Sequence, residues 1–162
     1  MEKKLQHALN EQIKNELYSS YLYLSMAAYC ESENLPGLAL WMKIQAKEEA
    51  GHGMKIFEFL VNRGVRVILQ VIPQPPIDFS SPQDIFEKTL EHEKKVTNLI
   101  HKLYETSKGV KDNSAQVFLQ WLITEQVEEE KNATHILGML QAIKPKSAGM
   151  IMLDKELGKR EG

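Results

Sequence analysis

Helix-breaking residues in this sequence are gathered into a few short stretches, and long runs of helix-forming residues separate them. Proline and glycine interrupt or end helices, so each uninterrupted run is expected to form one helix. A helix of about 27 residues would be roughly 40 Å long, and four such helices favour an all-α bundle. The expected long helices cover about residues 2–34, 37–63, 82–108 and 113–141, and a short fifth helix covers about 147–158, after the capping residue Ser147.

The lengths of the connections predict how the helices are joined. The breaks at 34–37 and 109–112 are short, so each should join two antiparallel neighbours. The middle connection, from Val65 to Ser81, is long enough to span roughly 50 Å when extended, at about 3.3 Å per residue. We therefore expect one long crossover between helices two and three. Its alternating apolar residues indicate that one side is covered, either by its own subunit or by a neighbouring subunit.

Composition narrows the classes of function. The chain has 162 residues, which predicts one domain over 1–162, and its net charge of -2 argues against a nucleic-acid partner. Its single cysteine, Cys30, cannot form an intrachain disulfide. No apolar run is long enough for a membrane span, and the first residues lack the apolar core of a signal peptide. We expect a cytoplasmic protein without a membrane partner.

Each long helix carries an apolar stripe with a spacing of three or four residues, and polar residues interrupt every stripe near its midpoint. The midpoints of antiparallel helices in a bundle lie at the same height. The interrupting side chains should therefore converge on one buried place. These residues are Glu16, Glu49, His52, Glu93, Gln126 and Glu129.

Several buried carboxylates in one place are costly unless they bind protons or cations. No lysine or arginine occupies the central register of any stripe, so buried salt bridges do not explain the pattern. A single glutamate on such a stripe is more often a boundary residue that reaches water. Four helices with acids at one height instead favour a metal centre, and carboxylates with an imidazole suit iron or manganese.

The chain resembles the ferritins, and in particular the bacterial non-haem ferritins. The resemblance rests on NELYSSYLYLSMA around Glu16, KEEAGHGMKIFEFL around Glu49 and His52, TEQVEEEK around Gln126, and the crossover VRVILQVIPQPPIDF. It implies a ferritin-like four-helix bundle with a short C-terminal fifth helix. It also implies iron storage, in which a non-haem di-iron centre oxidises Fe(II) with dioxygen or peroxide. The Fe(III) mineral would lie inside a hollow shell of twenty-four self-associated subunits.

The resemblance also implies roles for individual residues. Glu16, Glu49 and His52 would hold the first iron, with Glu49 bridging to the second. Glu93 and Glu129 would hold the second iron, with Gln126 close by. Tyr23 would lie against the centre as a hydrogen-bonding and candidate redox residue, and Trp121 is a weaker candidate for the same role. A third, inward-facing iron site would use Glu129 together with Glu48, Glu125 and Glu128.

Three departures from related families refine the expectation. The fourth helix carries Gln126-x-x-Glu129 where bacterioferritins and rubrerythrins would have a second Glu-x-x-His, so these families are disfavoured. Ala50 stands where bacterioferritins carry the haem-ligating methionine, so no haem is expected. Gln116 and Leu119 stand where animal ferritins have the paired acids of their three-fold pore. Two rival functions stay open at this point: a di-iron oxidase of another substrate, and a metal-free helical interaction protein.

Overall fold

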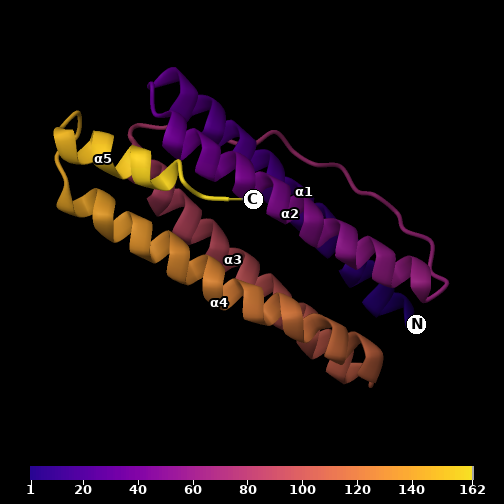
Figure 1. Ribbon diagram of the computed structural model, residues 1–162. Helices are drawn as coiled ribbons and strands as arrows, with labels where there is room; N and C mark the ends of the chain where they lie inside the picture. The colour runs from indigo at the N-terminus through magenta and orange to yellow at the C-terminus, as the bar shows by residue number, and fades with distance from the viewer. Residues whose placement is uncertain (162) are drawn as a thin grey trace.

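The computed structural model describes residues 1–161 and contains five helices within them (Figure 1). Every helix begins and ends within two residues of its expected bounds. Residues 1–161 form no β-strand, and no helix among them is long and apolar enough to cross a membrane. The helices are α1 (Lys3–Ser32), α2 (Pro36–Asn62), α3 (Pro82–Gly109), α4 (Asn113–Ala142) and α5 (Ala148–Leu157).

The first turns of the helices show why proline and capping residues predicted the helix boundaries. Proline occupies the first turn of α2 and of α3, where it has no hydrogen bond to lose. Ser81 accepts a hydrogen bond from the Asp84 backbone N–H, at 3.1 Å, and so caps α3. Asp112 caps α4 in the same way through the Ala115 N–H, at 3.0 Å. Ser147 accepts from the Met150 N–H at 3.4 Å, which confirms the cap expected for the fifth helix.

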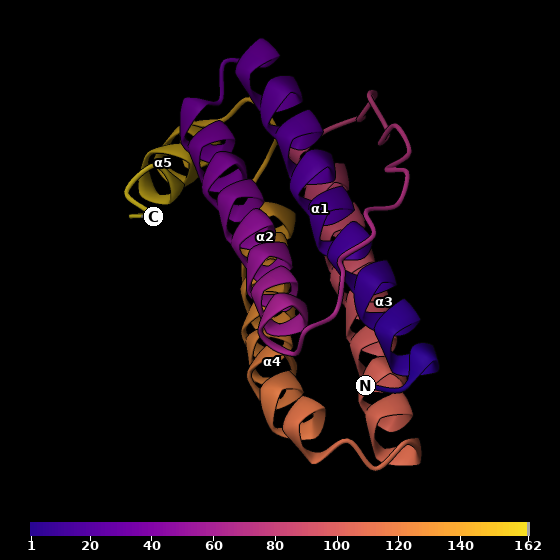
Figure 2. The same cartoon turned by 90° about the vertical axis from the view of Figure 1, so that its right-hand side faces the viewer.

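The four long helices form two hairpins linked by the crossover. Helix α1 packs on α2, α3 packs on α4, and α1 also contacts α3 (Figures 1 and 2). The crossover follows α1, where the Ile68 N–H donates to Asn10 Oδ1 at 2.7 Å and Ser25 Oγ donates to the Pro76 carbonyl at 2.6 Å. These contacts lie near opposite ends of α1, so the crossover runs along the bundle as its length predicted.

The crossover is covered by the bundle at intervals along its whole course, and Pro75 and Phe79 are buried in its second half. Val65 and Val67 are partly buried, whereas Leu69 is 65% exposed and Val71 is 87% exposed. The apolar alternation therefore does not reflect a strand. Some of these side chains pack on the bundle, and a single subunit leaves the others exposed.

The apolar core is divided into two clusters that occupy opposite ends of the bundle. Leu9, Ile56 and Ile100 belong to one cluster, while Met42 and Phe86 belong to the other. Burying each such side chain contributes about 1.5–3 kcal/mol to folding. The division follows from the polar interruptions in the stripes, and it places a polar layer in the middle of the molecule.

Helix α5 docks on the beginning of α2 through one acid and one glycine. Asp154 Oδ1 accepts from the Leu38 N–H at 2.9 Å, which satisfies a free donor of the first turn of α2. Gly37 allows the close approach, because a Cβ atom at this position would lie 1.7 Å from the Asp154 carbonyl oxygen. The contact fixes the C-terminal segment on α2.

Replacing Gly37 with alanine should therefore destabilise the fold by about 1–3 kcal/mol, because α5 must shift away from α2. Gly138→Ala is the matched control, since a Cβ atom there meets no heavy atom within 4 Å. That control should be neutral or stabilising by up to about 1 kcal/mol. Thermal unfolding of the two variants checks the prediction, and equal melting temperatures would contradict it.

Candidate metal centre

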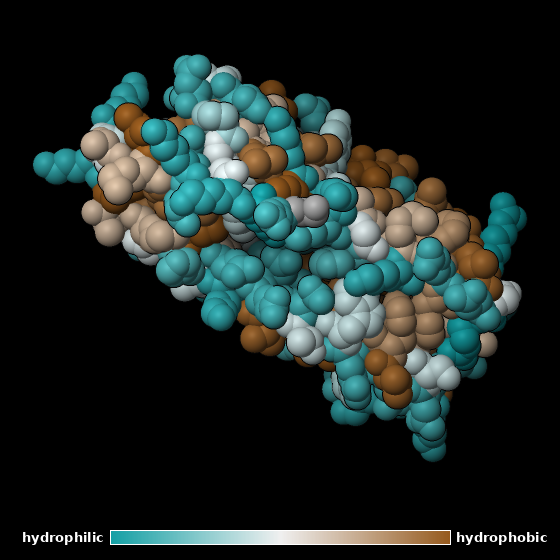
Figure 3. All heavy atoms as spheres, in the orientation of Figure 1, coloured by the Kyte–Doolittle hydropathy of each residue, from teal (hydrophilic) through white to brown (hydrophobic). Residues whose placement is uncertain are grey.

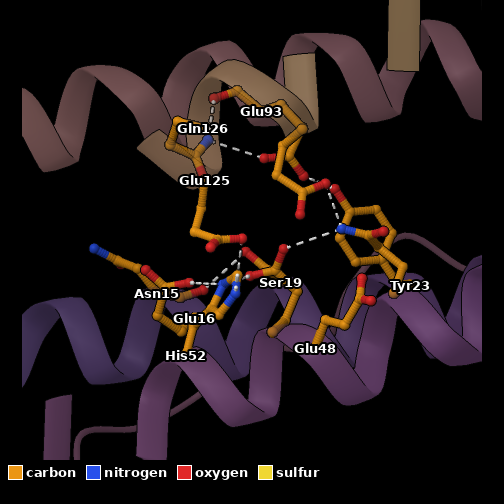
Figure 4. Close-up of polar contacts among 12 residues, drawn as sticks. Asn15, Glu16, Ser19, Tyr23, Glu48, His52, Glu93, Glu125 and Gln126 are labelled. Carbon is orange, nitrogen blue, oxygen red and sulfur yellow. Dashed lines mark hydrogen bonds and ion pairs between the residues drawn. The ribbon is translucent and has the colours of Figure 1, made fainter. Parts of the chain in front are cut away.

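The polar interruptions of the four stripes meet in one buried layer between the two apolar clusters. All six expected residues are buried, and none is more than 7% exposed. Glu16 comes from α1, Glu49 and His52 from α2, and the remaining three from α3 and α4. Figure 4 shows side chains from the two helix pairs pointing toward one another across this layer. The four helices thus contribute these six residues to the buried middle of the bundle.

Glu16, Glu49 and His52 form a compact set of metal-ligand atoms. One ligand atom from each residue lies within 4.8 Å of the others, and all three residues are buried. The Nδ1 atom of His52 is 3.7 Å from an oxygen of Glu16 and 3.7 Å from an oxygen of Glu49. Within residues 1–161, no other group of three or more acidic, histidine or cysteine ligands meets this closely.

Two atoms of this set lack a hydrogen-bond partner although they are buried: Glu16 Oε2 and His52 Nδ1. A buried polar atom without a partner costs about 1–3 kcal/mol, and charged groups cost more. The distance of 3.7 Å between these atoms is too long for a hydrogen bond. It does suit two ligands that share one ion, each at about 2.0–2.2 Å. The donor atoms therefore fit a divalent cation.

Glu93 and Glu129 do not belong to this compact set, and each accepts hydrogen bonds from uncharged side chains instead. Glu93 accepts hydrogen bonds from the Tyr23 hydroxyl and, at 3.1 Å, from Gln126 Nε2. Glu129 Oε2 accepts from Gln45 Nε2 at 2.6 Å. Both acids border the buried layer, but their hydrogen bonds are satisfied without an ion. Glu16, Glu49 and His52 thus already lie together, whereas Glu93 and Glu129 are each hydrogen-bonded to neighbouring side chains.

Tyr23 and Trp121 both lie against the layer. Tyr23 is fully buried, and burial together with the nearby charge of Glu93 raises its pKa well above the usual value. The phenol therefore stays protonated and donates to Glu93. The Trp121 ring meets the His52 ring edge-on, with 5.3 Å between centroids, and its Nε1 atom is buried without a partner. Tyr23 consequently has direct contact with an acid of the second pair, and Trp121 contacts the first set only through His52.

Several supporting residues were not assigned a role from the sequence. Gln12 Nε2 donates to Glu16 Oε1 at 2.6 Å, and Gln45 lies one helical turn before Glu49. Both lie four residues before an acid on the same helix face, so this spacing could have indicated them. His92 accepts from or donates to Ser19 Oγ at 2.8 Å beside Tyr23. Arg160 reaches the layer from the C-terminal segment, and no periodic pattern predicts that contact.

The acids expected to form a third site line a cavity beside the centre. Glu48, Glu125 and Glu128 border a cavity of about 360 Å³, together with Glu129 and His52. His52 Nε2 is 4.0 Å from a carboxylate oxygen of Glu125, so the imidazole belongs both to the first set of ligands and to the wall of this cavity. Hydrophilic side chains gather over the middle of this face of the molecule, where α2, α4 and the C-terminal segment meet (Figure 3).

The electrostatics of the layer show how it behaves without a cation. Burial raises the pKa of Glu49 and of Glu93, and it raises the pKa of Glu129 to about 7, with a further contribution from the charge of Glu93. Burial alone would lower the pKa of His52, but Glu16 and Glu49 raise it to about 10. The layer therefore retains protons near neutral pH. A metal ion would displace them, so binding should weaken in acid.

Above pH 6.5, the metal-free protein should lose stability as the pH rises. Glu129 and His52 both have higher pKa values in the folded chain than their ordinary values of 4.5 and 6.5, so the folded state binds more protons, and raising the pH favours unfolding. His92, whose pKa burial lowers to about 4, opposes this trend only below about 6.5. We expect Glu129→Gln to raise the stability at pH 8 by roughly 1–3 kcal/mol.

Thermal unfolding of the metal-free protein between pH 6.5 and 8 measures this effect. Glu91→Gln is a suitable control, because Glu91 is an exposed acid on α3. An identical pH slope in Glu129→Gln and the unmodified protein would show that Glu129 does not retain its proton.

Carboxylates and a histidine that project into the middle of a four-helix bundle are the ligand arrangement of the ferritin-like class of proteins. A family model described as a ferritin-like domain matches residues 6–143. The chain belongs to this family. It is 39% identical over 157 residues to a bacterial non-heme ferritin of Bacteroides fragilis, a match that covers 97% of this chain and 98% of the relative. A bacterial non-heme ferritin of Staphylococcus aureus is 37% identical over 160 residues, covering 99% of this chain and 96% of that one.

Solved structures give the same family at higher identity. The chain is similar to an open pore ferritin from the hyperthermophilic archaeon Archaeoglobus fulgidus, with a TM-score of 0.98, 45% identity and 99% of each chain covered. It is also similar to a closed form of that ferritin made by site-directed mutagenesis, with a TM-score of 0.97, 45% identity and coverage of 99% and 98%. The expected resemblance to the ferritins, with its four-helix bundle, is confirmed.

Proposed function

We propose that this protein stores iron by oxidising Fe(II) at the buried layer and depositing Fe(III) inside a hollow shell. The observation that carries the proposal is the set of Glu16, Glu49 and His52, in which two buried atoms have no partner and match the needs of a shared ion. Membership of the ferritin family supports iron as that ion. Iron is here the substrate and the cargo.

Two Fe(II) ions would occupy the layer at once. Glu16, Glu49 and His52 hold the first ion, and Glu49 bridges to the second. Glu93 and Glu129 hold the second ion through carboxylate lone pairs that their present hydrogen bonds leave free, with Gln126 nearby. The two ions give up two electrons, which reduce dioxygen to peroxide or peroxide to water. The carboxylates neutralise the growing positive charge of Fe(III), and Tyr23 remains a proton donor beside Glu93.

The acid-lined cavity is the proposed route by which Fe(III) leaves the buried layer. Glu48, Glu125 and Glu128 line this cavity together with His52, a member of the first set of ligands. Additional carboxylates at this distance attract Fe(III) more strongly than Fe(II), because the interaction energy grows with charge. We propose that oxidised iron passes through this third site toward the interior of the shell.

Self-association into that shell would cover apolar surface that one subunit leaves open. On the crossover, Val71 is 87% exposed and Ile77 is 64% exposed, and on α5, Met152 is 72% exposed. Exposed apolar groups on two separate elements favour at least two kinds of subunit contact. A closed shell of twenty-four subunits, each a single domain of residues 1–162 and located in the cytoplasm, accommodates both contacts.

Calorimetric titration with Fe(II) under nitrogen tests the proposal. Two Fe(II) ions should bind per subunit, and air added afterwards should produce Fe(III) that leaves the layer and accumulates as mineral. A protein that binds no Fe(II) would be the metal-free interaction protein. A protein that keeps two oxidised ions in place and forms no mineral would be an oxidase of another substrate.

A further inference from the structure

Arg160 holds the C-terminal segment against α2 by contacts of three kinds. Its guanidinium donates to Gln45 Oε1 at 3.0 Å and to the Trp41 carbonyl at 3.4 Å. It also pairs with Glu48 and lies 4.5 Å from the centre of the Trp41 ring. The side chain is only 19% exposed, although it follows the last helix. An arginine with this many directed contacts is fixed in place.

The contact with Gln45 determines which way the amide of Gln45 points. Its oxygen accepts from Arg160, so its Nε2 group must face the buried layer. There Nε2 donates to Glu129 Oε2 at 2.6 Å and lies 3.5 Å from Glu49 Oε1. The opposite orientation would place the amide oxygen against the Glu129 carboxylate and the amide N–H groups against the guanidinium. Arg160 therefore selects the orientation in which Gln45 holds Glu129.

We propose that Arg160 is a positioning residue for the second metal position, and that it acts through Gln45 on the carboxylate of Glu129. The inference rests on the proposed two-ion function and deepens it. Arg160 does not touch the metal positions. Arg160 donates a hydrogen bond to Gln45, and Gln45 in turn donates one to the proposed ligand Glu129. Outer partners of metal ligands typically change metal affinity or activity by about 10–100-fold when they are removed.

If Arg160 acted only through its charge, the effect of Arg160→Ala on binding of the second ion would be opposite to the effect expected from positioning. Arg160 is a cation at the edge of the acid-lined cavity, and it neutralises Glu48. If charge alone mattered, Arg160→Ala would strengthen the binding of a second cation. If positioning of Glu129 dominates, the same change weakens that binding. The direction of the change therefore separates the two explanations.

The test uses oxygen-free titration of the assembled protein with Co(II), followed by calorimetry and by visible absorption, which reports the coordination of each bound ion. Arg160→Ala and Gln45→Leu should each weaken the second ion about tenfold. They should weaken the first ion much less, because Gln45 Nε2 is 2.6 Å from Glu129 Oε2 but 3.5 Å from Glu49 Oε1. The double variant should lose no more than either single variant, because both changes break one path. Arg160→Lys keeps the charge without the forked contact and should give an intermediate loss.

Lys159→Ala is the matched control, because Lys159 is the adjacent cation and pairs with exposed Glu156 at 2.6 Å. It should change neither ion. A second ion that binds equally well or more tightly in Arg160→Ala would overturn the role of Arg160, as would fully additive losses in the double variant. An unmodified protein that binds fewer than two ions would instead contradict the two-ion function, and the role of Arg160 would fall with it.

Discussion

Replacing Glu49 with alanine is expected to abolish the rapid phase of Fe(II) oxidation while the bundle still folds. Glu49 is the proposed bridge, so its loss removes a ligand from both ions and should slow the rapid phase by at least about a hundredfold. Glu49 is also a buried acid whose pKa is raised by burial. Removing it takes an unfavourable group out of the core, so the metal-free variant should not be less stable by more than about 1–2 kcal/mol.

Stopped-flow absorbance of the early Fe(III) product measures the effect, and circular dichroism verifies the fold. Glu91→Ala is the control, because this exposed acid of α3 lies two residues from Glu93 and outside the buried layer. The control should oxidise Fe(II) at the unmodified rate. A normal rapid phase in Glu49→Ala would remove Glu49 from the centre.

A double change on α4, Gln126→Glu with Glu129→His, is expected to make the layer retain oxidised iron instead of releasing it to the mineral. In the proposed centre, the first ion has an imidazole and two carboxylates as ligands, whereas the second ion has no histidine. The present ligands should therefore bind the second ion more weakly. The double change gives the second ion a histidine and an added acid. We expect it to hold two ions at least tenfold longer and to deliver several-fold less iron to the mineral.

Loading with one portion of labelled iron and chasing with unlabelled iron measures the time that each ion spends at the layer. Gln141→Glu is the control, since it adds an acid at an exposed position in the last turn of α4, outside the layer. Equal residence times in the double variant and the unmodified protein would contradict the asymmetry, as would two equally tight sites in the unmodified protein.

The bundle and the first set of ligands were predictable because their causes are local. Proline, glycine and capping residues define each helix end within a few positions, as Pro82 and Ser81 do for α3. The three- and four-residue spacing then assigns Glu16 and Glu49 to the buried stripes of their helices. Short connections place the midpoints at one height. These rules need no knowledge of the partner side chains.

Other features depend on contacts between segments far apart in sequence, which no local pattern contains. Arg160 and Gln45 are 115 residues apart, and only the docking of α5 brings them together. Periodicity placed Glu93 and Glu129 in the buried layer. It could not show that Tyr23 and Gln45 already hold their carboxylates. The same limit applies to the crossover. Its exposed apolar side chains are expected to contact a neighbouring subunit, whose surface no local sequence pattern describes.

Size measurement combined with iron analysis after loading with Fe(II) in air tests whether this protein stores iron in a shell. We expect an assembly many times heavier than the 18.6 kDa subunit, carrying far more Fe(III) than two ions per subunit in a mineral core. A species of subunit mass, or an assembly that never holds more than two iron ions per subunit, would contradict iron storage by this protein.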